Sequence, residues 1–172
     1  MKPHVDVQFA LDFPALDEVP AAEQVEAWAT AALAAVDDAR TAAATLTVRI
    51  VGRDEISALN ADYRHRQGPT NVLSFPFEAP PGVDDAELAA MLGDVVVCAE
   101  VVGDEAREQG KPVSAHWAHM IVHGTLHLLG FDHLTEQQAA RMEALEIDVL
   151  AGLGIANPYL KLDEPKHARV DR

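Results

Sequence analysis

The sequence His123-Gly124-Thr125-Leu126-His127-Leu128-Leu129-Gly130-Phe131-Asp132-His133 places three histidines within eleven residues. On a helix, His123 and His127 share one face, with Cβ atoms about 5–6 Å apart. Gly130 predicts the end of that helix, because glycine adopts the left-handed backbone conformation of a helix terminus at little cost. The chain can then reverse and bring His133 to the same point. The spacing therefore predicts a helix and a turn that gather three imidazoles.

Three histidines are a typical ligand set for catalytic zinc. Each imidazole reaches the metal at about 2.0–2.1 Å, and three protein ligands leave the fourth position open for water or substrate. We therefore expect one Zn²⁺ ion held by His123, His127 and His133. Asp132 either orients one of these histidines through a hydrogen bond or bonds its own backbone as a turn aspartate, and the sequence supports both alternatives equally.

His119 extends the four-residue spacing in the other direction. Residues eight apart on a helix lie about 12 Å apart along its axis, so His119 and His127 cannot bind one ion. At most two neighbouring members of the series are ligands, and the third comes from beyond the turn. We expect His116 and His119 to pack, cap or hydrogen-bond instead.

Composition indicates one soluble globular domain. The chain has 172 residues and a mass of 18.5 kDa, which is one domain's length and enough for a proper core. The lone Cys98 and the lack of a secretory signal predict a cytoplasmic location. No apolar run approaches the about 18–20 residues that span a bilayer, so no membrane partner is expected. The net charge of −15 argues against a general nucleic-acid coat protein, although Arg64-His65-Arg66 forms a local basic turn.

Hydrophobic patterning predicts an α+β fold, with about four strands in a mixed sheet packed against about five helices. Asp54 is expected to cap the second helix, Pro76 to place the third strand at a sheet edge or strand end, and Thr135 with Gln138 to form a capping box. The domain is expected to cover residues 1–156, and 157–172 to be a polar, flexible tail. The expected strands cover 4–11, 44–51, 70–77 and 92–98; the helices cover 21–36, 54–63, 99–109, 112–129 and a segment from 135 to about 153.

The histidine spacing also matches the metzincin metalloproteases at all three ligands and at Gly130. Those proteases need a glutamate directly after the first histidine, as general base for the attacking water. Gly124 occupies that position and can do no acid–base chemistry. A zinc hydrolase of peptides or another small substrate is therefore an alternative that lacks its expected base.

The same histidine stretch resembles the signature of the YbeY family of bacterial endoribonucleases. Tyr63-Arg64 with Pro69-Thr70-Asn71-Val72-Leu73-Ser74-Phe75-Pro76-Phe77 resembles that family's central segment, and Leu92-Gly93-Asp94-Val95-Val96-Val97-Cys98 resembles its next strand. The resemblance covers about Asn60 to Leu153. It implies a zinc-dependent, single-strand-specific endoribonuclease that acts in 16S ribosomal RNA 3′-end maturation, ribosome assembly and ribosome quality control.

The resemblance also implies residue roles and partners. Arg64 matches the family's functional arginine and would be the catalytic residue that grips a phosphate with two hydrogen bonds; Arg66 is an alternative. Gln67-Gly68 replaces a common acidic residue and lysine, and Phe131 replaces a common tyrosine. The implied partners are single-stranded RNA, ribosomal small-subunit proteins and assembly factors, and neither DNA nor a membrane. A non-catalytic assembly protein with a structural zinc is a further alternative.

Overall fold

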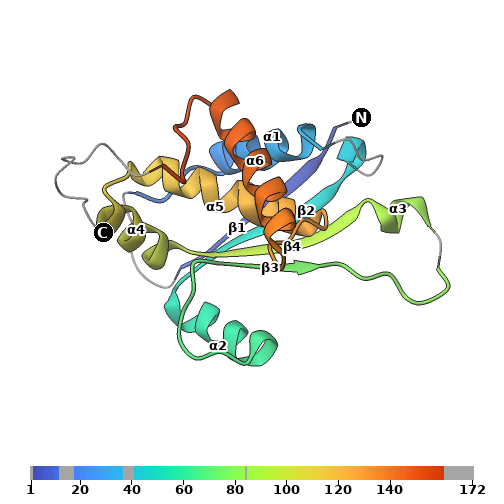
Figure 1. Ribbon diagram of the computed structural model, residues 1–172. Helices are drawn as coiled ribbons and strands as arrows, with labels where there is room; N and C mark the ends of the chain where they lie inside the picture. The colour runs from blue at the N-terminus through green and yellow to red at the C-terminus, as the bar shows by residue number, and fades with distance from the viewer. Residues whose placement is uncertain (1, 12–17, 37–40, 84, 161–172) are drawn as a thin grey trace.

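Four strands form one mixed sheet in the computed structural model, which describes residues 2–11, 18–36, 41–83 and 85–160 (Figure 1). The spatial order is β1-β2-β4-β3, and β3 runs antiparallel to β4 while the other neighbours are parallel. β3 is therefore an edge strand, and the expected edge position of Pro76 is confirmed. The strands are β1 (His4–Ala10), β2 (Thr45–Val51), β3 (Val72–Pro76) and β4 (Met91–Cys98).

The described part of the chain contains six α-helices and one short 3-10 turn, η1 (Thr41–Ala43). The prediction of about five helices did not include α3, which is only four residues long. The expected cap of α2 was wrong as well, because Gly52 is the N-cap residue and Asp54 lies in the first turn. The helices are α1 (Ala22–Ala34), α2 (Arg53–Arg64), α3 (Ala86–Ala89), α4 (Ala99–Gln109), α5 (Val113–Leu128) and α6 (Glu136–Gly152).

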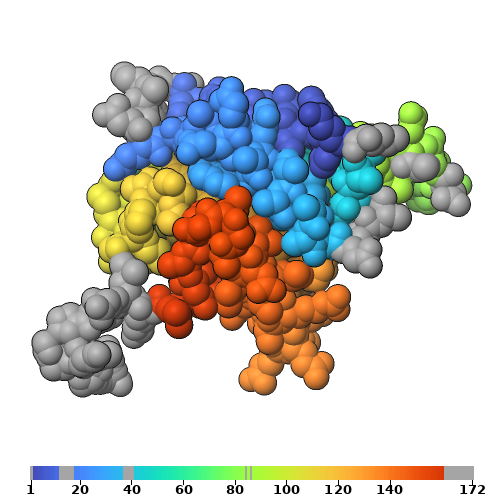
Figure 2. Space-filling model, turned by 90° about the horizontal axis from the view of Figure 1, so that it is seen from above, coloured from blue at the N-terminus to red at the C-terminus, as the bar shows by residue number. Residues whose placement is uncertain are grey.

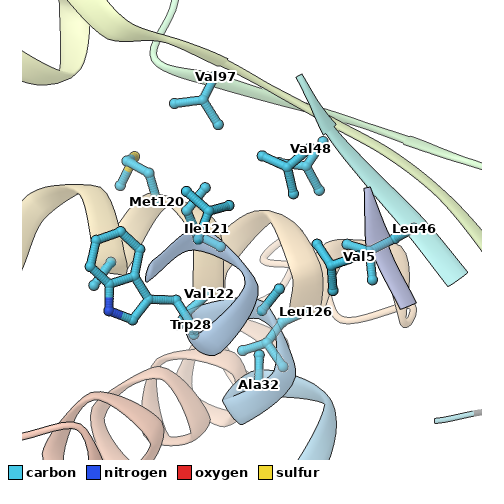
Figure 3. Packing of buried hydrophobic residues seen from close by; sticks show 14 of the residues in the cluster. Val5, Trp28, Ala32, Leu46, Val48, Val97, Met120, Ile121, Val122 and Leu126 are labelled. Carbon is cyan, nitrogen blue, oxygen red and sulfur yellow. The ribbon is translucent and has the colours of Figure 1, made fainter. Parts of the chain in front are cut away.

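Helix α5 occupies the centre of the fold. It contacts β3 and β4 on one side and α1, α4 and α6 on the others, and eleven of its sixteen residues are buried. In Figure 3, Val48 and Val97 of the sheet point toward Ile121 of α5, and Trp28 of α1 packs beside that helix. Figure 2, which views the molecule from above, shows α1 and α6 lying side by side. The backbone that carries His123 and His127 is thus held from several directions.

The second face of the sheet carries α2 (Figure 1). Its Ile56 is fully buried in a smaller apolar cluster with Leu73, Val96 and Cys98. Because side chains alternate along a strand, β3 presents Leu73 to α2 and Ser74 to α5. The Ser74 hydroxyl donates a 3.0 Å hydrogen bond to the Gly124 carbonyl of α5. One edge strand thus separates the basic turn after α2 from the histidines of α5.

The chain beyond α6 returns to α5. Residues 157–160 form a turn, and Lys111 Nζ donates a 3.1 Å hydrogen bond to the Pro158 carbonyl. The expected flexible tail begins in this packed turn, and for residues 161–172, which lie outside the described residues, it stays a prediction. Within the ranges given above, no helix has the length and apolar character needed to cross a membrane.

Candidate metal centre

The end of α5 has the geometry that the histidine spacing predicts. Gly130 has φ +102°. Its N–H donates to the His127 carbonyl at 3.0 Å, and the Phe131 N–H donates to the Leu126 carbonyl at 3.1 Å. These two bonds form a Schellman motif, in which a left-handed glycine closes the last turn of a helix. The chain reverses immediately after it and brings His133 back toward the helix.

The three histidines lie together at this end of α5. One ring nitrogen from each of His123, His127 and His133 can be chosen so that all three lie within 4.8 Å of one another. The His123 side chain is 20% exposed and the His133 side chain is 55% exposed, so the group opens to solvent. Burial and the neighbouring His123 charge lower the pKa of His127, which favours the neutral imidazole that binds metals. The donor set fits a zinc ion with an open position.

A buried carboxylate lies behind these histidines. Glu146 of α6 is fully buried. Its Oε2 lies 2.5 Å from His123 Nδ1 and its Oε1 lies 2.9 Å from His119 Nε2. The Tyr159 hydroxyl donates a hydrogen bond to the same Oε1. Both carboxylate oxygens are therefore occupied by partners from α5 and from the turn after α6.

Sequence reasoning missed Glu146, although a signal for it exists. The residue falls on the buried stripe of α6, which also contains Met142, Val149 and Leu150. Glutamate is almost never fully buried unless it is paired. A glutamate inside an apolar helical stripe therefore predicts a buried partner, and the two α5 histidines are that partner.

The protonation states follow from this arrangement. Burial acts to raise the pKa of the Glu146 carboxyl, but hydrogen bonds from His119 and His123 outweigh it and hold the pKa at about 2. The carboxylate is therefore ionised at neutral pH. Burial lowers the pKa of His119, so this imidazole is neutral there. Burial and the hydrogen bond to Glu146 raise the pKa of Tyr159, and its hydroxyl remains a proton donor.

Two overlapping groups of side chains could each hold a metal ion. The second group consists of His119, His123 and Glu146, but its members are already hydrogen-bonded to one another in the interior. His119 does not group with His127, as the helical spacing requires. The expected hydrogen bonding of His116 and His119 is confirmed, because His116 Nε2 lies 2.8 Å from Glu105 Oε1. The group that opens to solvent is the better candidate for a catalytic ion.

Asp132 accepts a hydrogen bond from the His133 backbone N–H at 2.8 Å. Its carboxylate lies 3.9 Å from His133 Nδ1, beyond hydrogen-bond distance. The geometry is that of a turn aspartate, and the orienting role of Asp132 stays a prediction.

Gly124, next to His123, faces the sheet. A Cβ atom at this position would lie 2.6 Å from Val95 Cγ1 and 3.3 Å from Val72 Cγ2, and Val95 is fully buried. A glutamate here would collide with β4 instead of reaching the histidines. The close approach of α5 to the sheet therefore excludes the general base that a metzincin protease places at this position.

Comparison with known proteins gives the family. The profile of the endoribonuclease YbeY family matches residues 15–154. The chain belongs to the YbeY family. Proteins named endoribonuclease YbeY include one from Halorhodospira halophila, 55% identical over 154 residues, which are 90% of this chain and 97% of that protein. Another, from Alkalilimnicola ehrlichii, is 60% identical over 137 residues, 80% of each chain, and one from Alcanivorax borkumensis is 47% identical over 98% of this chain and 93% of its own.

A solved structure shares the fold. The solution structure of TM1509 from Thermotoga maritima superposes with a TM-score of 0.51 and 20% identity, covering 90% of this chain and 99% of that one. At this identity the likeness concerns the fold alone. It supports the α+β architecture, with helices on both faces of a mixed sheet, as one that a distant sequence also adopts.

The arginine that the resemblance to YbeY singled out lies apart from the histidines. Arg64 is the exposed last residue of α2, and α2 lies on the opposite face of the sheet from α5 (Figure 1). His65 follows it in the left-handed conformation, with φ +57°. Tyr63 packs edge-on against Phe75 of β3, with ring centroids 5.2 Å apart. Among the residues that the structure describes, none forms an ion pair with Arg64, so its guanidinium is available to a ligand.

Proposed function

We propose that this protein is a zinc-dependent endoribonuclease that cuts single-stranded RNA. We further propose that it acts in the cytoplasm in 16S ribosomal RNA 3′-end maturation, ribosome assembly and ribosome quality control. Membership in a family of endoribonucleases supports RNA cleavage. The single observation that carries the chemistry is the solvent-open cluster of three imidazoles at the end of α5, which fits a catalytic rather than a closed structural zinc site.

In this proposal His123, His127 and His133 hold the ion. When bound, zinc polarises the scissile phosphate and lowers the pKa of an attacking water. Arg64, across the edge strand β3, grips a phosphate oxygen pair of the same RNA strand through its guanidinium fork and so positions that strand for cleavage at the histidines. The nucleophile is either water or the RNA's own 2′-hydroxyl. Attack by the 2′-hydroxyl leaves a 2′,3′-cyclic phosphate, so the chemistry of the product ends distinguishes them.

The preference for single strands rests on the surface around β3. Tyr63 is 65% exposed and is braced by Phe75, while Arg64 and Arg66 supply positive charge beside it. Exposed aromatic rings with neighbouring cations are typical of single-strand binding, because an unpaired base stacks on the ring while its phosphates meet the cations. A duplex offers no free base face to Tyr63.

Protein partners fit the rest of the surface. The net charge of −15 disfavours non-specific binding to duplex RNA or DNA. We therefore propose that small-subunit ribosomal proteins and assembly factors, many of which are basic because they bind RNA, bring the enzyme to its substrate. Electrostatic complementarity of this kind speeds and directs association.

Cleavage of a labelled single-stranded fragment from the 3′ region of 16S ribosomal RNA tests the proposal. The wild type and His127→Ala are purified in parallel, and circular dichroism checks both for folding. We expect cleavage by the wild type alone, and slower cleavage of the same fragment in a duplex. Equal cleavage by both proteins would mean a contaminating nuclease and would remove the support for the proposal.

If neither protein cuts free RNA, small-subunit precursor particles are supplied as substrate. Absence of cleavage there as well would favour the non-catalytic assembly protein. Peptide hydrolysis that depends on His127 would favour the alternative zinc hydrolase, which the lack of room for a base at Gly124 disfavours.

A further inference from the structure

In the described part of the chain, Glu146 is the only carboxylate within hydrogen-bond distance of a ring nitrogen of the three candidate metal ligands. His123 Nδ1 lies 2.5 Å from Glu146 Oε2, whereas the nearest carboxylate oxygen to a ring nitrogen of His133 is 3.9 Å away. Among the three histidines, the ring of His123 is therefore held by a specific partner. The two others are positioned by the helix end and by the turn.

We propose that Glu146 is a positioning residue, which holds His123 as an Nε2 metal ligand, and that Tyr159 locks Glu146 in place. The inference rests on the proposed metal site. A neutral imidazole carries one N–H, and an Nδ1–H that donates to a carboxylate leaves the Nε2 lone pair for the metal. Metal-bound histidines usually donate their second ring nitrogen in this way. Glu146 therefore fixes both the tautomer and the ring orientation of His123.

The remaining contacts fix Glu146 itself. The Tyr159 hydroxyl and His119 Nε2 both donate to Oε1, which leaves Oε2 to His123. The Tyr159 ring also packs edge-on against the His119 ring, with centroids 5.3 Å apart. Lys111 ties the preceding Pro158 to the start of α5. The turn after α6 is thereby connected to the metal ligand through two successive hydrogen bonds.

This arrangement distinguishes His119 from the ligands. Its Nε2 is committed to Glu146, and its Nδ1 is buried with no hydrogen-bond partner among the described residues. His119 therefore acts as a support for the carboxylate. In this scheme the turn at residues 157–160, which the sequence assigned to a tail, belongs to the metal centre.

Metal binding without RNA tests the proposal. Zinc affinity is measured by competition with a chromophoric chelator, and the coordination geometry is followed by the visible spectrum of the Co²⁺-substituted protein. Glu146→Gln should weaken zinc binding by about 10–100-fold, the usual effect of removing such a partner, and should change the Co²⁺ spectrum. Tyr159→Phe should produce a smaller change in the same direction.

Glu105→Gln is the matched control. Glu105 also accepts a hydrogen bond from an α5 histidine, His116, at 2.8 Å, but no candidate metal ligand contacts it. This variant should keep wild-type zinc affinity and the wild-type Co²⁺ spectrum. Urea unfolding of each metal-free variant separates lost stability from lost metal binding, and Tyr159→Phe keeps the test decisive if Glu146→Gln fails to fold.

The proposal would be overturned if a folded Glu146→Gln variant kept the wild-type zinc affinity and Co²⁺ spectrum. If Glu146→Gln does not fold, the same result for Tyr159→Phe would overturn it. Absence of zinc binding by the wild type would overturn both this inference and the proposed metal site. If the wild type binds zinc, the variants weaken it as expected and no RNA is cut, the positioning role stands while the proposed function fails.

Discussion

Replacing Gly124 with alanine tests how closely α5 approaches the sheet beside the candidate metal centre. Removing a glycine from a helix interior normally stabilises the helix by about 1 kcal/mol. Here the new Cβ would lie 2.6 Å from Val95 Cγ1, about 1 Å inside ordinary van der Waals contact, and 3.3 Å from Val72 Cγ2. Val95 is fully buried on an interior strand and has little room to yield.

Overpacking of a core usually costs about 1–3 kcal/mol, and the lack of room beside Val95 places this site near the upper end. Subtracting the gain in helix propensity leaves a net destabilisation of about 1–2 kcal/mol. For a domain of this size that corresponds to a Tm lowered by about 3–6 °C. Relief of the collision requires α5 to move away from β4, which also displaces His123 and His127, so RNA cleavage should fall as well.

Thermal and urea unfolding of Gly124→Ala measure the effect, with Gly103→Ala as the control. Gly103 is also buried in the interior of a helix, α4, but its added Cβ would meet nothing closer than 3.6 Å. The control should be neutral or stabilised by up to about 1 kcal/mol. The further substitution Val95→Ala should lower the free energy of unfolding less in Gly124→Ala than it does in the wild type, because it removes the collision. If Gly124→Ala is as stable as Gly103→Ala, the close contact argued for α5 does not exist.

Three further outcomes are expected. Arg64→Ala should keep its fold and zinc affinity but cut RNA about 10–100-fold more slowly in single-turnover assays, the size expected for a charged hydrogen bond; an unchanged rate would transfer the role to Arg66. A chelator should abolish cleavage and lower the Tm, and zinc at 100 times its Kd should raise the free energy of unfolding by about 2.7 kcal/mol. A Tm that responds to neither the chelator nor zinc would refute a metal site formed in the native state. The metal-free protein should lose stability, measured by urea unfolding, as the pH falls below 6.5, because the folded-state pKa of His127 is lowered, and again from pH 4.5 toward 2, because the pKa of Glu146 in the folded protein is about 2. Each group binds more protons in the unfolded state, so the free energy of unfolding must rise with pH. A free energy of unfolding that rises on acidification would contradict these pKa directions.

Local patterns predicted the elements well. The alternation of Leu46, Val48 and Ile50 places all three on the buried face of β2 toward α5, because a period of two is a property of the strand itself. The capping box of Thr135 and Gln138 is present at the start of α6, since it needs only residues three apart. The histidine cluster was predictable for the same reason, because its geometry follows from one helix and one glycine turn.

The remainder of the site depends on contacts between distant segments. Glu146 is 23 residues from His123, and Tyr159 lies where composition indicates a polar tail. Nothing in a local pattern reports that α6 crosses α5 at the metal end. The position of Arg64 is equally non-local, because the order β1-β2-β4-β3 inserts β4 between β2 and β3, and only the assembled sheet shows which face α2 occupies.

The edge strand β3 also affects how copies of the protein behave toward each other. The Asn71 carbonyl accepts a hydrogen bond from the Cys98 N–H, and the Phe77 N–H donates to the Leu92 carbonyl. Along an antiparallel strand, backbone groups point alternately toward the neighbouring strand and away from it. The odd-numbered residues of β3 therefore bond to β4, and the even-numbered residues direct their N–H and C=O groups outward. The Val72 N–H is satisfied by the Asn71 side chain at 2.7 Å, and Pro76 has no N–H to offer. Among the residues that the structure describes, none accepts from the Ser74 N–H, which leaves it as the one outward amide of β3 with a proton available for pairing. An edge with a single donor is a poor template for a strand from another molecule, so the surface beside the metal centre can stay uncovered without promoting sheet-to-sheet aggregation.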